Sequence, residues 1–272
     1  MYDFHVHSDF SEDSSAKMED VIKISIKKGL KEICFTDHSD YDFAGTGIDS
    51  NYFRFDIKEY FSAIEEYKKK YQNNIIIRIG IELGLQAHTL DCCKKEVNSH
   101  DFDFAIASVH SLEGADFIDP DYFDGKTQKQ AYERYFHELD YIVNNYEDYN
   151  VLGHLDIIKR YGGYNAPLPF VEYYDTVVAI LKKAIEKGKG IELNTSGIRY
   201  KLGDYHPSTD IVKLYHSLGG EIITMGSDAH DPLYMGFDFT NALNHLKDIG
   251  FKYITSFEKM KPIFHNIDDL LI

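Results

Sequence analysis

The sequence predicts an α/β barrel formed by a single domain that spans residues 1–272. Short runs of β-branched and aromatic residues alternate with segments of helical periodicity, which favours a parallel sheet. Seven or eight such units fill the chain of 272 residues, and that number favours closing the sheet into a barrel rather than leaving it open.

Strands are expected where short apolar runs lie between turn signals, at 2–7, 32–36, 75–83, 102–109, 151–154, 190–194, 221–225 and, as a weaker pattern, 251–256. Helices are expected at 18–28, 57–71, 90–98, 128–145, 171–187, 209–218 and 239–249. In the second of these helices, apolar residues keep to one face at helical spacing: Tyr60, Phe61, Ile64 and Tyr67.

The connections between these elements differ in length. Helix-to-strand connections such as 29–31 are short, whereas the strand-to-helix connections 39–56, 111–127, 159–170 and 196–208 are long. All strand-to-helix loops of a barrel lie at its carboxyl-terminal face, where catalytic residues gather. We therefore expect the functional residues at that face, with 39–56 as a possible lid over a substrate.

Composition limits the classes of partner. Lysine and arginine total 29 and aspartate and glutamate total 45, so the net charge is 29 − 45 = −16. This charge disfavours broad binding to nucleic acid or to an anionic membrane, but it permits a small anionic ligand. No apolar run reaches the roughly 18 residues of a membrane span, and residues 1–7 do not resemble a signal peptide. Because Cys34, Cys92 and Cys93 suggest neither a metal site nor a disulfide framework, we expect a cytoplasmic protein.

The first expected strand contains a potential metal-binding pair. Asp3, His5 and His7 follow one another at every second position, which places them on one face of a strand. Two imidazoles on one face can hold a metal ion, and Asp3 is better placed to orient a ligand than to be one. The alternative is a pair of histidines on a half-buried strand.

Other histidines and acids recur at or just beyond the ends of the later strands. They are Asp13, Asp37, His38, Glu82, His110, His154, Asp228 and His230. A barrel brings these ends together, and so many imidazoles and carboxylates share a pocket only when cations hold them. The sequence thus predicts a multi-metal site for zinc, manganese or iron. The remaining histidines lack this placement and are assigned to helix faces, loops and the tail: His88, His100, His137, His206, His216, His245 and His265.

Two arginines follow strand ends on the same predicted face, Arg160 and Arg199. Guanidinium groups bind phosphate oxygens through paired hydrogen bonds, although for either arginine taken alone a surface ion pair is slightly favoured. Arg78 and Arg134 lie within a strand and a helix and are taken as structural. Arg54, in the long second loop, is either a third arginine at the site or solvated.

These residues together resemble the polymerase and histidinol phosphatase (PHP) superfamily. The matching motifs are Asp3-x-His5-x-His7, Asp13, Thr36-Asp37-His38, Gly80-x-Glu82, Ser108-Val109-His110, Gly153-His154 and Gly226-Ser227-Asp228-Ala229-His230. The phrases at 153–161 and 192–197 are similar to the histidinol-phosphate phosphatase branch in particular.

The resemblance implies a distorted (β/α)7 barrel with three divalent metal ions. By position, the first ion would be held by His5, His7, Glu82 and Asp228. Glu82 would bridge to a second ion held by His110 and His154, and the third would be held by Asp13, His38 and His230. Other members have a histidine where this chain has Asp13, and aspartate is a hard ligand that can take its place.

The resemblance also implies a phosphomonoesterase that hydrolyses L-histidinol phosphate in histidine biosynthesis, by attack of a metal-bridging hydroxide on phosphorus. Arg160 and Arg199 would hold the phosphate, and either Asp228 or a metal-bound water would protonate the leaving oxygen. Glu113 and Asp116 are candidates to bind the cationic end of the substrate.

Two other functions remain open. One is a phosphatase of the same superfamily that acts on phosphotyrosine proteins or nucleotides. The other is a metal-binding regulatory or structural module without catalysis, although the sequence lacks none of the expected ligands. The sequence does not indicate an oligomeric state.

Overall fold

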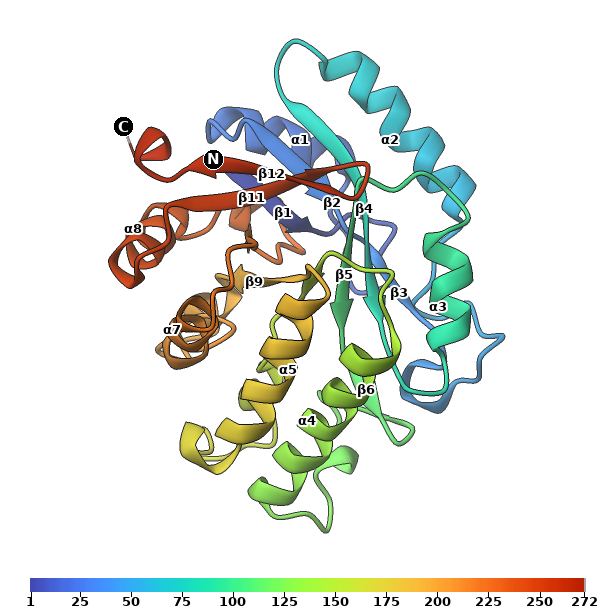
Figure 1. Ribbon diagram of the computed structural model, residues 1–272. Helices are drawn as coiled ribbons and strands as arrows, with labels where there is room; N and C mark the ends of the chain where they lie inside the picture. The colour runs from blue at the N-terminus through green and yellow to red at the C-terminus, as the bar shows by residue number, and fades with distance from the viewer. Residues whose placement is uncertain (272) are drawn as a thin grey trace.

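The computed structural model describes residues 1–271, and its centre is a parallel sheet curved into a nearly closed barrel (Figure 1). The seven strands of the barrel follow the order β1 (Tyr2–Val6), β2 (Glu32–Phe35), β4 (Ile76–Gly84), β5 (Phe104–Ser108), β8 (Val151–Leu152), β9 (Gly190–Asn194) and β10 (Ile223–Gly226). An additional short strand, β3 (His38–Asp40), continues from β2 and pairs with the end of β4.

The barrel closes between its first and last strands. The backbone N–H of Asp228 donates to the carbonyl of His5 at 2.9 Å, and the N–H of His7 donates to the carbonyl of Ala229 at 3.1 Å. These bonds lie just beyond β10, so closure is tightest at the carboxyl-terminal end of the strands. The prediction of a distorted α/β barrel is confirmed.

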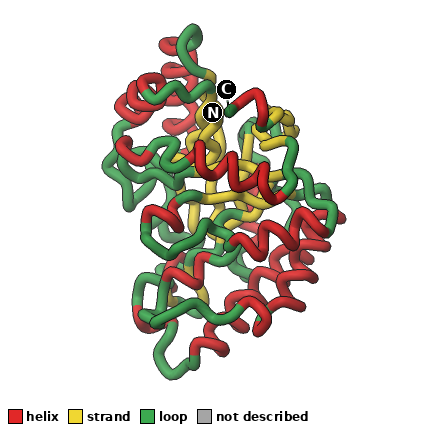
Figure 2. The backbone as a smooth tube through the Cα atoms, turned by 90° about the vertical axis from the view of Figure 1, so that its left-hand side faces the viewer, coloured by secondary structure: helices red, strands yellow, loops and turns green. Residues whose placement is uncertain are grey.

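Helices surround the strands on the outside (Figure 2). They are α1 (Met18–Lys27), α2 (Ile57–Tyr71), α3 (Leu90–Val97), α4 (Gln128–Asn145), α5 (Tyr174–Glu186), α6 (Ser196–Arg199), α7 (Thr209–Ser217) and α8 (Phe239–Ile249). Local signals fix several of their starts: Asp56 accepts hydrogen bonds from the first turn of α2, and Thr127 forms a capping box with Gln130 at the start of α4. In residues 1–271, no helix is long and apolar enough to cross a membrane.

Strands in three parts of the chain differ from the expected pattern. The loop expected at 39–56 begins within β3, and the loop at 111–127 contains a hairpin of β6 (Ser111–Leu112) and β7 (Ala115–Asp116). The weak pattern at 251–256 forms β11 (Tyr253–Glu258), which pairs with β12 (Lys261–Asn266) in a hairpin outside the barrel sheet.

The sequence does not indicate the β11–β12 turn because its residues are unusual for such a turn. Lys259 and Met260 have φ values of 50° and 62°, a left-handed conformation that is usually occupied by asparagine or glycine in two-residue hairpins. The carboxylate of Asp103 holds the turn by accepting the Lys259 N–H at 3.0 Å. A long-range contact thus replaces the missing local signal.

The hairpin packs against an apolar cluster formed from the barrel strands. Phe257 of β11 lies against Phe104, with ring centroids 5.1 Å apart, and Phe104 in turn packs edge-on against Phe4. Cys34, Ile106 and Val151 complete this cluster. The barrel is therefore apolar where its strands pack against the hairpin. Charged and polar groups occupy the carboxyl-terminal ends of the strands.

We predict that Phe257→Ala lowers the free energy of unfolding by about 3–4 kcal/mol, because it removes a fully buried ring from this cluster. Urea denaturation monitored by circular dichroism measures the loss. Phe264→Ala is the matched control in the same hairpin, since that ring is 45% exposed, and it should cost less than about 1 kcal/mol. Equal losses in the two variants would show that the hairpin does not stabilise the barrel through Phe257.

Candidate metal centre

The centre of the site is Glu82, a fully buried carboxylate near the end of β4. Its Oε2 lies 3.0 Å from His5 Nε2 and 3.4 Å from His7 Nε2. Its Oε1 lies 3.0 Å from His154 Nε2 and 3.2 Å from His110 Nε2. Four histidines from three separate parts of the chain therefore converge on one acidic side chain.

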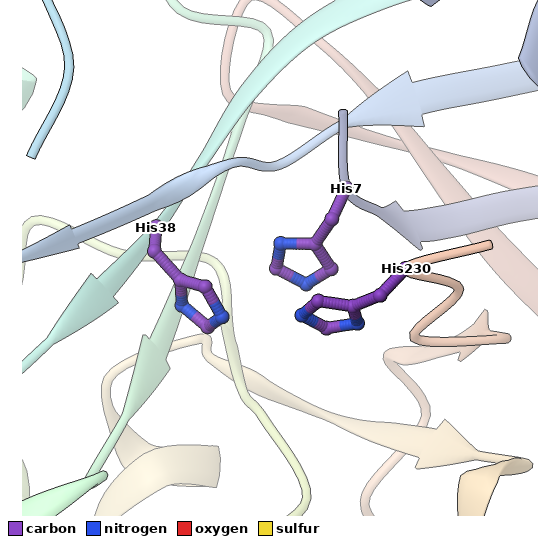
Figure 3. A group of neighbouring side chains, drawn as sticks. All are labelled: His7, His38 and His230. Carbon is purple, nitrogen blue, oxygen red and sulfur yellow. The ribbon is translucent and has the colours of Figure 1, made fainter. Parts of the chain in front are cut away.

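A group of three imidazoles lies beside Glu82. Potential ligand atoms of His7, His38 and His230 all lie within 4.8 Å of one another (Figure 3). His38 is also tied to Glu82, with its Nδ1 3.2 Å from Oε2. Asp13 joins this group from the first loop, where its Oδ2 lies 3.2 Å from His230 Nε2 and 3.7 Å from His38 Nε2.

Asp228 connects the two groups. Its Oδ1 lies 3.5 Å from both His7 Nε2 and His230 Nδ1, and 3.8 Å from His5 Nε2. The residue has a φ of 52°, in the left-handed region, and its backbone N–H is held by the carbonyl of His5. The structure thus brings all nine of the side chains predicted as metal ligands into one cluster.

The chemistry of these side chains fits divalent cations. Burial, together with His230 and His38, lowers the pKa of His7 well below its ordinary value, so this imidazole is neutral and keeps a lone pair for a metal. Among residues 1–271, three buried nitrogens make no well-aligned hydrogen bond, although carboxylate oxygens lie 3.2–3.4 Å away: His7 Nε2, His38 Nδ1 and His230 Nε2. Buried nitrogens of this kind normally have a partner, and a metal ion would supply it.

The acids in the cluster carry negative charge that needs compensation. Burial alone would raise the pKa of Glu82, but His5, His110 and His38 hold it well below its ordinary value. Burial would likewise lower the pKa of His5, but Glu192 and Glu82 raise it well above the ordinary value. Protons and divalent cations are therefore alternative sources of positive charge around the same carboxylate.

Acidic residues behind the cluster orient its imidazoles, and sequence reasoning did not identify them. Glu192 of β9 lies 2.7 Å from His5 Nδ1 through one oxygen and accepts the His154 backbone N–H at 2.9 Å through the other. Gly226 makes room for this pair, since a Cβ there would overlap both Glu192 and His5. Asp40 of β3 lies 2.6 Å from His110 Nδ1. Such partners fix the ring orientation of metal-ligating histidines.

Asp37, which was expected among the strand-end acids, also acts from behind the cluster. It accepts a hydrogen bond from Ser11 Oγ at 2.7 Å, and that hydroxyl lies 3.0 Å from His7 Nδ1. Asp37 also accepts the N–H of Ser8 at 2.6 Å, which fixes the turn that follows β1. Its carboxylate therefore positions His7 indirectly.

Asp3 orients the site through the segment that carries Asp228 rather than through an imidazole. Its carboxylate accepts the backbone N–H and the hydroxyl of Ser227, at 2.9 and 2.6 Å, and the N–H of Gly236 at 2.9 Å. The register of β1 shifts between Asp3 and Val6, so strict alternation fails along this strand. Asp3 ties β1 to the segment after β10, and burial raises its pKa to about 6 despite these hydrogen bonds.

A cavity of about 230 Å³ opens over the cluster. Its polar surface includes Asp13, His38, His110, His154, Asp228 and His230. Its apolar walls come from two long loops, which contribute Phe43 and Phe53 from one and Phe117 and Ile118 from the other. The long strand-to-helix loops therefore build the cavity, as their length suggested.

The two arginines predicted to hold phosphate differ in placement. Arg160 lines the cavity. Arg199 is not among the lining residues, and its guanidinium donates to the carbonyls of Ser227 and Asp228, at 2.7 and 2.8 Å. In this structure Arg199 holds the backbone that carries Asp228.

The two acids predicted to bind the cationic end of the substrate also differ in placement. Asp116 lines the cavity. Glu113 does not, and its carboxylate is paired with Arg134 at 3.0 Å and Lys126 at 3.2 Å. These long-range cations were not visible in the local sequence around Glu113.

The remaining arginines and one histidine have clear structural roles. Arg78 pairs with Glu32 at 2.6 Å, as expected of a structural residue. Arg54 stacks on Tyr41 at 3.8 Å from the ring centroid and thus fixes its own loop. His206, which was assigned to a loop, is fully buried, and its Nδ1 lies 2.8 Å from the carboxylate of Asp156.

Taken together, the fold and the clustered ligands define an α/β barrel with a metal-binding site at the carboxyl-terminal ends of its strands. The model of the PHP domain family matches residues 3–196. The chain belongs to this family.

The similarity to known proteins extends over nearly the whole chain. A histidinol-phosphatase of Lactococcus lactis is 32% identical, over 95% of this chain and 95% of the relative. A probable histidinol-phosphatase of Clostridium acetobutylicum is 31% identical, over 95% of this chain and 97% of that protein. The crystal structure of the Lactococcus enzyme, complexed with zinc, L-histidinol and phosphate, matches with a TM-score of 0.84 at 31% identity, over 96% of this chain and 98% of the other.

We predict that Glu192→Gln weakens zinc binding at least about tenfold, because the variant loses the charge that orients His5. Competition with a chromophoric chelator measures the dissociation constant. Glu186→Gln is the control, since this exposed glutamate on α5 pairs with Lys183 at the surface. Zinc affinity equal to that of the unmodified protein in both variants would contradict the role assigned to Glu192.

Proposed function

We propose that this protein is a metal-dependent phosphomonoesterase that hydrolyses L-histidinol phosphate to L-histidinol and phosphate in histidine biosynthesis. The observation that carries the proposal is the cluster around Glu82, which lies beneath a cavity that also contains Arg160. The Lactococcus relative, named a histidinol-phosphatase and crystallised with zinc, L-histidinol and phosphate, supports this choice of substrate.

We assign three divalent cations to the cluster, with zinc as the first choice and manganese or iron as alternatives. The first would be held by His5, His7, Glu82 and Asp228, the second by Glu82, His110 and His154, and the third by Asp13, His38 and His230. Close approach of the potential ligand atoms supports the first two sets. The contacts of Asp13 with both imidazoles support the third.

Bound cations would lower the pKa of a water molecule and balance the charge of a phosphate ester during hydrolysis. Arg160 would donate hydrogen bonds to the phosphate oxygens from the cavity wall. Asp228 faces the same cavity and is our candidate to pass a proton to the leaving oxygen, with a water molecule as the other candidate. Arg199 would contribute by holding the Asp228 backbone.

The other end of the substrate would lie between the two long loops. Its imidazole suits the aromatic walls formed by Phe43, Phe53 and Phe117, and its ammonium group suits the carboxylate of Asp116. Glu113 is left out of this proposal because Arg134 and Lys126 already neutralise it. We also place the enzyme in the cytoplasm, since its three cysteines are free thiols, as is usual in a reducing compartment.

We predict that chelation abolishes phosphatase activity and that zinc or manganese restores it. A panel of L-histidinol phosphate, phosphotyrosine peptide and nucleoside monophosphate should give the highest kcat/KM for L-histidinol phosphate. Full activity in demonstrably metal-free protein would contradict the metal-dependent mechanism. A higher kcat/KM for another ester would instead overturn the choice of substrate.

Arg160→Ala should raise KM for L-histidinol phosphate by about 10–100-fold, since it removes a charged hydrogen-bond donor to phosphate. Steady-state kinetics measures the change, and metal analysis should show unchanged metal content. Arg78→Ala is a matched control, because that guanidinium pairs with Glu32 and Glu258 and does not line the cavity. An unchanged KM in Arg160→Ala would remove this arginine from the binding site.

A further inference from the structure

Arg160 is held at the cavity in an unusual way. Among residues 1–271, its guanidinium has no carboxylate within salt-bridge distance and donates no hydrogen bond, and its close contacts are with aromatic rings. The other four arginines in this part of the chain all have such partners, for example Arg78 with Glu32 and Arg199 with two carbonyls. A flexible side chain without such a partner would sample many rotamers, and fixing it on a ligand would cost entropy.

The contact that does hold Arg160 is an aromatic ring. Its Cζ lies 3.4 Å from the centroid of the Tyr200 ring. At this separation the guanidinium must lie nearly flat on the ring, because an edge-on group would push a nitrogen into the ring carbons. A second ring, that of Tyr161, lies farther away, with its centroid 5.2 Å from Cζ.

The position of Tyr200 is itself fixed. It follows α6 directly, and its backbone N–H donates to the carbonyl of Ser196 at 2.8 Å. Its ring also lies 5.1 Å from Cζ of Arg199, which is anchored on the Ser227 and Asp228 carbonyls. Tyr200 lines the cavity, and the negative face of its ring thus lies near two guanidinium groups.

Holding an arginine by a ring has a different effect from holding it by a carboxylate. A carboxylate would occupy the in-plane N–H donors and neutralise the charge, and it would then compete with a phosphate group. A stacked ring contacts only the face of the guanidinium, so the donors at its edge stay available for phosphate oxygens.

We propose that Tyr200 is a positioning residue that holds the Arg160 guanidinium on its ring with the N–H donors free for the phosphate group of the substrate. This inference rests on the proposed phosphatase function. It assigns to Tyr200 a role that depends on its aromatic face and not on its hydroxyl group. The role also acts through Arg160 rather than through direct contact with the substrate.

The first test compares Tyr200→Leu with Tyr200→Phe in the metal-loaded enzyme. Tyr200→Leu should raise both KM and the inhibition constant of inorganic phosphate by about fivefold to tenfold, with a smaller change in kcat. Tyr200→Phe keeps the ring and should restore both constants to within about twofold of the original values. Tyr174→Leu is the control, because Tyr174 on α5 is similarly exposed but does not line the cavity. Equal effects of Leu and Phe at position 200 would overturn the proposal.

A double-mutant cycle separates positioning from direct contact. In an Arg160→Ala background, Tyr200→Leu should cause no further increase in the inhibition constant of phosphate, since the group it positions is gone. An additional increase as large as in the unmodified enzyme would show that Tyr200 acts independently of Arg160, which overturns the proposal.

The same cycle distinguishes a failure of the role assigned to Tyr200 from a failure of the proposed substrate. It is run with L-histidinol phosphate and with p-nitrophenyl phosphate, and phosphate binding to the zinc-loaded protein is also measured by calorimetry. If L-histidinol phosphate is not hydrolysed, the proposed function fails, but the calorimetric cycle still decides on Tyr200. If turnover is normal and the cycle is additive, only the role of Tyr200 fails.

Discussion

The burial of an ionised carboxylate at Glu82 is the constraint on which the rest of the site depends. A charge that is fully buried requires nearby positive charge, and this chain surrounds it with imidazoles from β1, β3 and the segments after β5 and β8. Neutral imidazoles cannot balance the charge by themselves. Protonated histidines or bound metal ions can, which is why a cluster of this composition has a physical reason to bind cations.

The surrounding structure keeps this arrangement rigid. Glu192, Asp40 and Asp37 approach the imidazoles from behind, and Asp3 and Arg199 fix the backbone that carries Asp228. Apolar side chains of the barrel strands pack against the β11–β12 hairpin, and the polar groups of the site lie at the carboxyl-terminal ends of the strands. The long loops then add the aromatic walls and Arg160, so that the ligand cluster lies beneath an opening suited to a small phosphate ester.

Sequence reasoning located the barrel and the clustered side chains because both follow from local patterns. Strand periodicity places His5, Glu82 and His154 near the ends of strands, and a barrel then brings those ends together. The weak pattern at 251–256 located β11, but β3, β12 and the turn between β11 and β12 were missed, since β3 is only three residues long and the turn passes through Lys259 and Met260.

The parts that sequence reasoning could not provide depend on contacts between distant segments. In the sequence, Glu192 appeared only as part of the phrase at 192–197. Its contact with His5 was not predicted, because the sequence around a buried strand acid does not show which histidine it will contact. Arg199 and Glu113 are engaged by the Asp228 carbonyl and by Arg134, respectively, and neither partner is apparent from the neighbouring sequence. Asp3 meets Ser227 and Gly236, which lie at the other end of the chain and could not be identified as its partners from the first strand alone.

The most direct measurement is a crystal structure of the protein grown with zinc and phosphate, with anomalous data collected on both sides of the zinc absorption edge. The account predicts zinc peaks at about 2.0–2.2 Å from the Glu82 oxygens and from Nε2 of His5 and His154, with a phosphate beside Arg160. Absence of zinc from this cluster in crystals of fully active enzyme would contradict it.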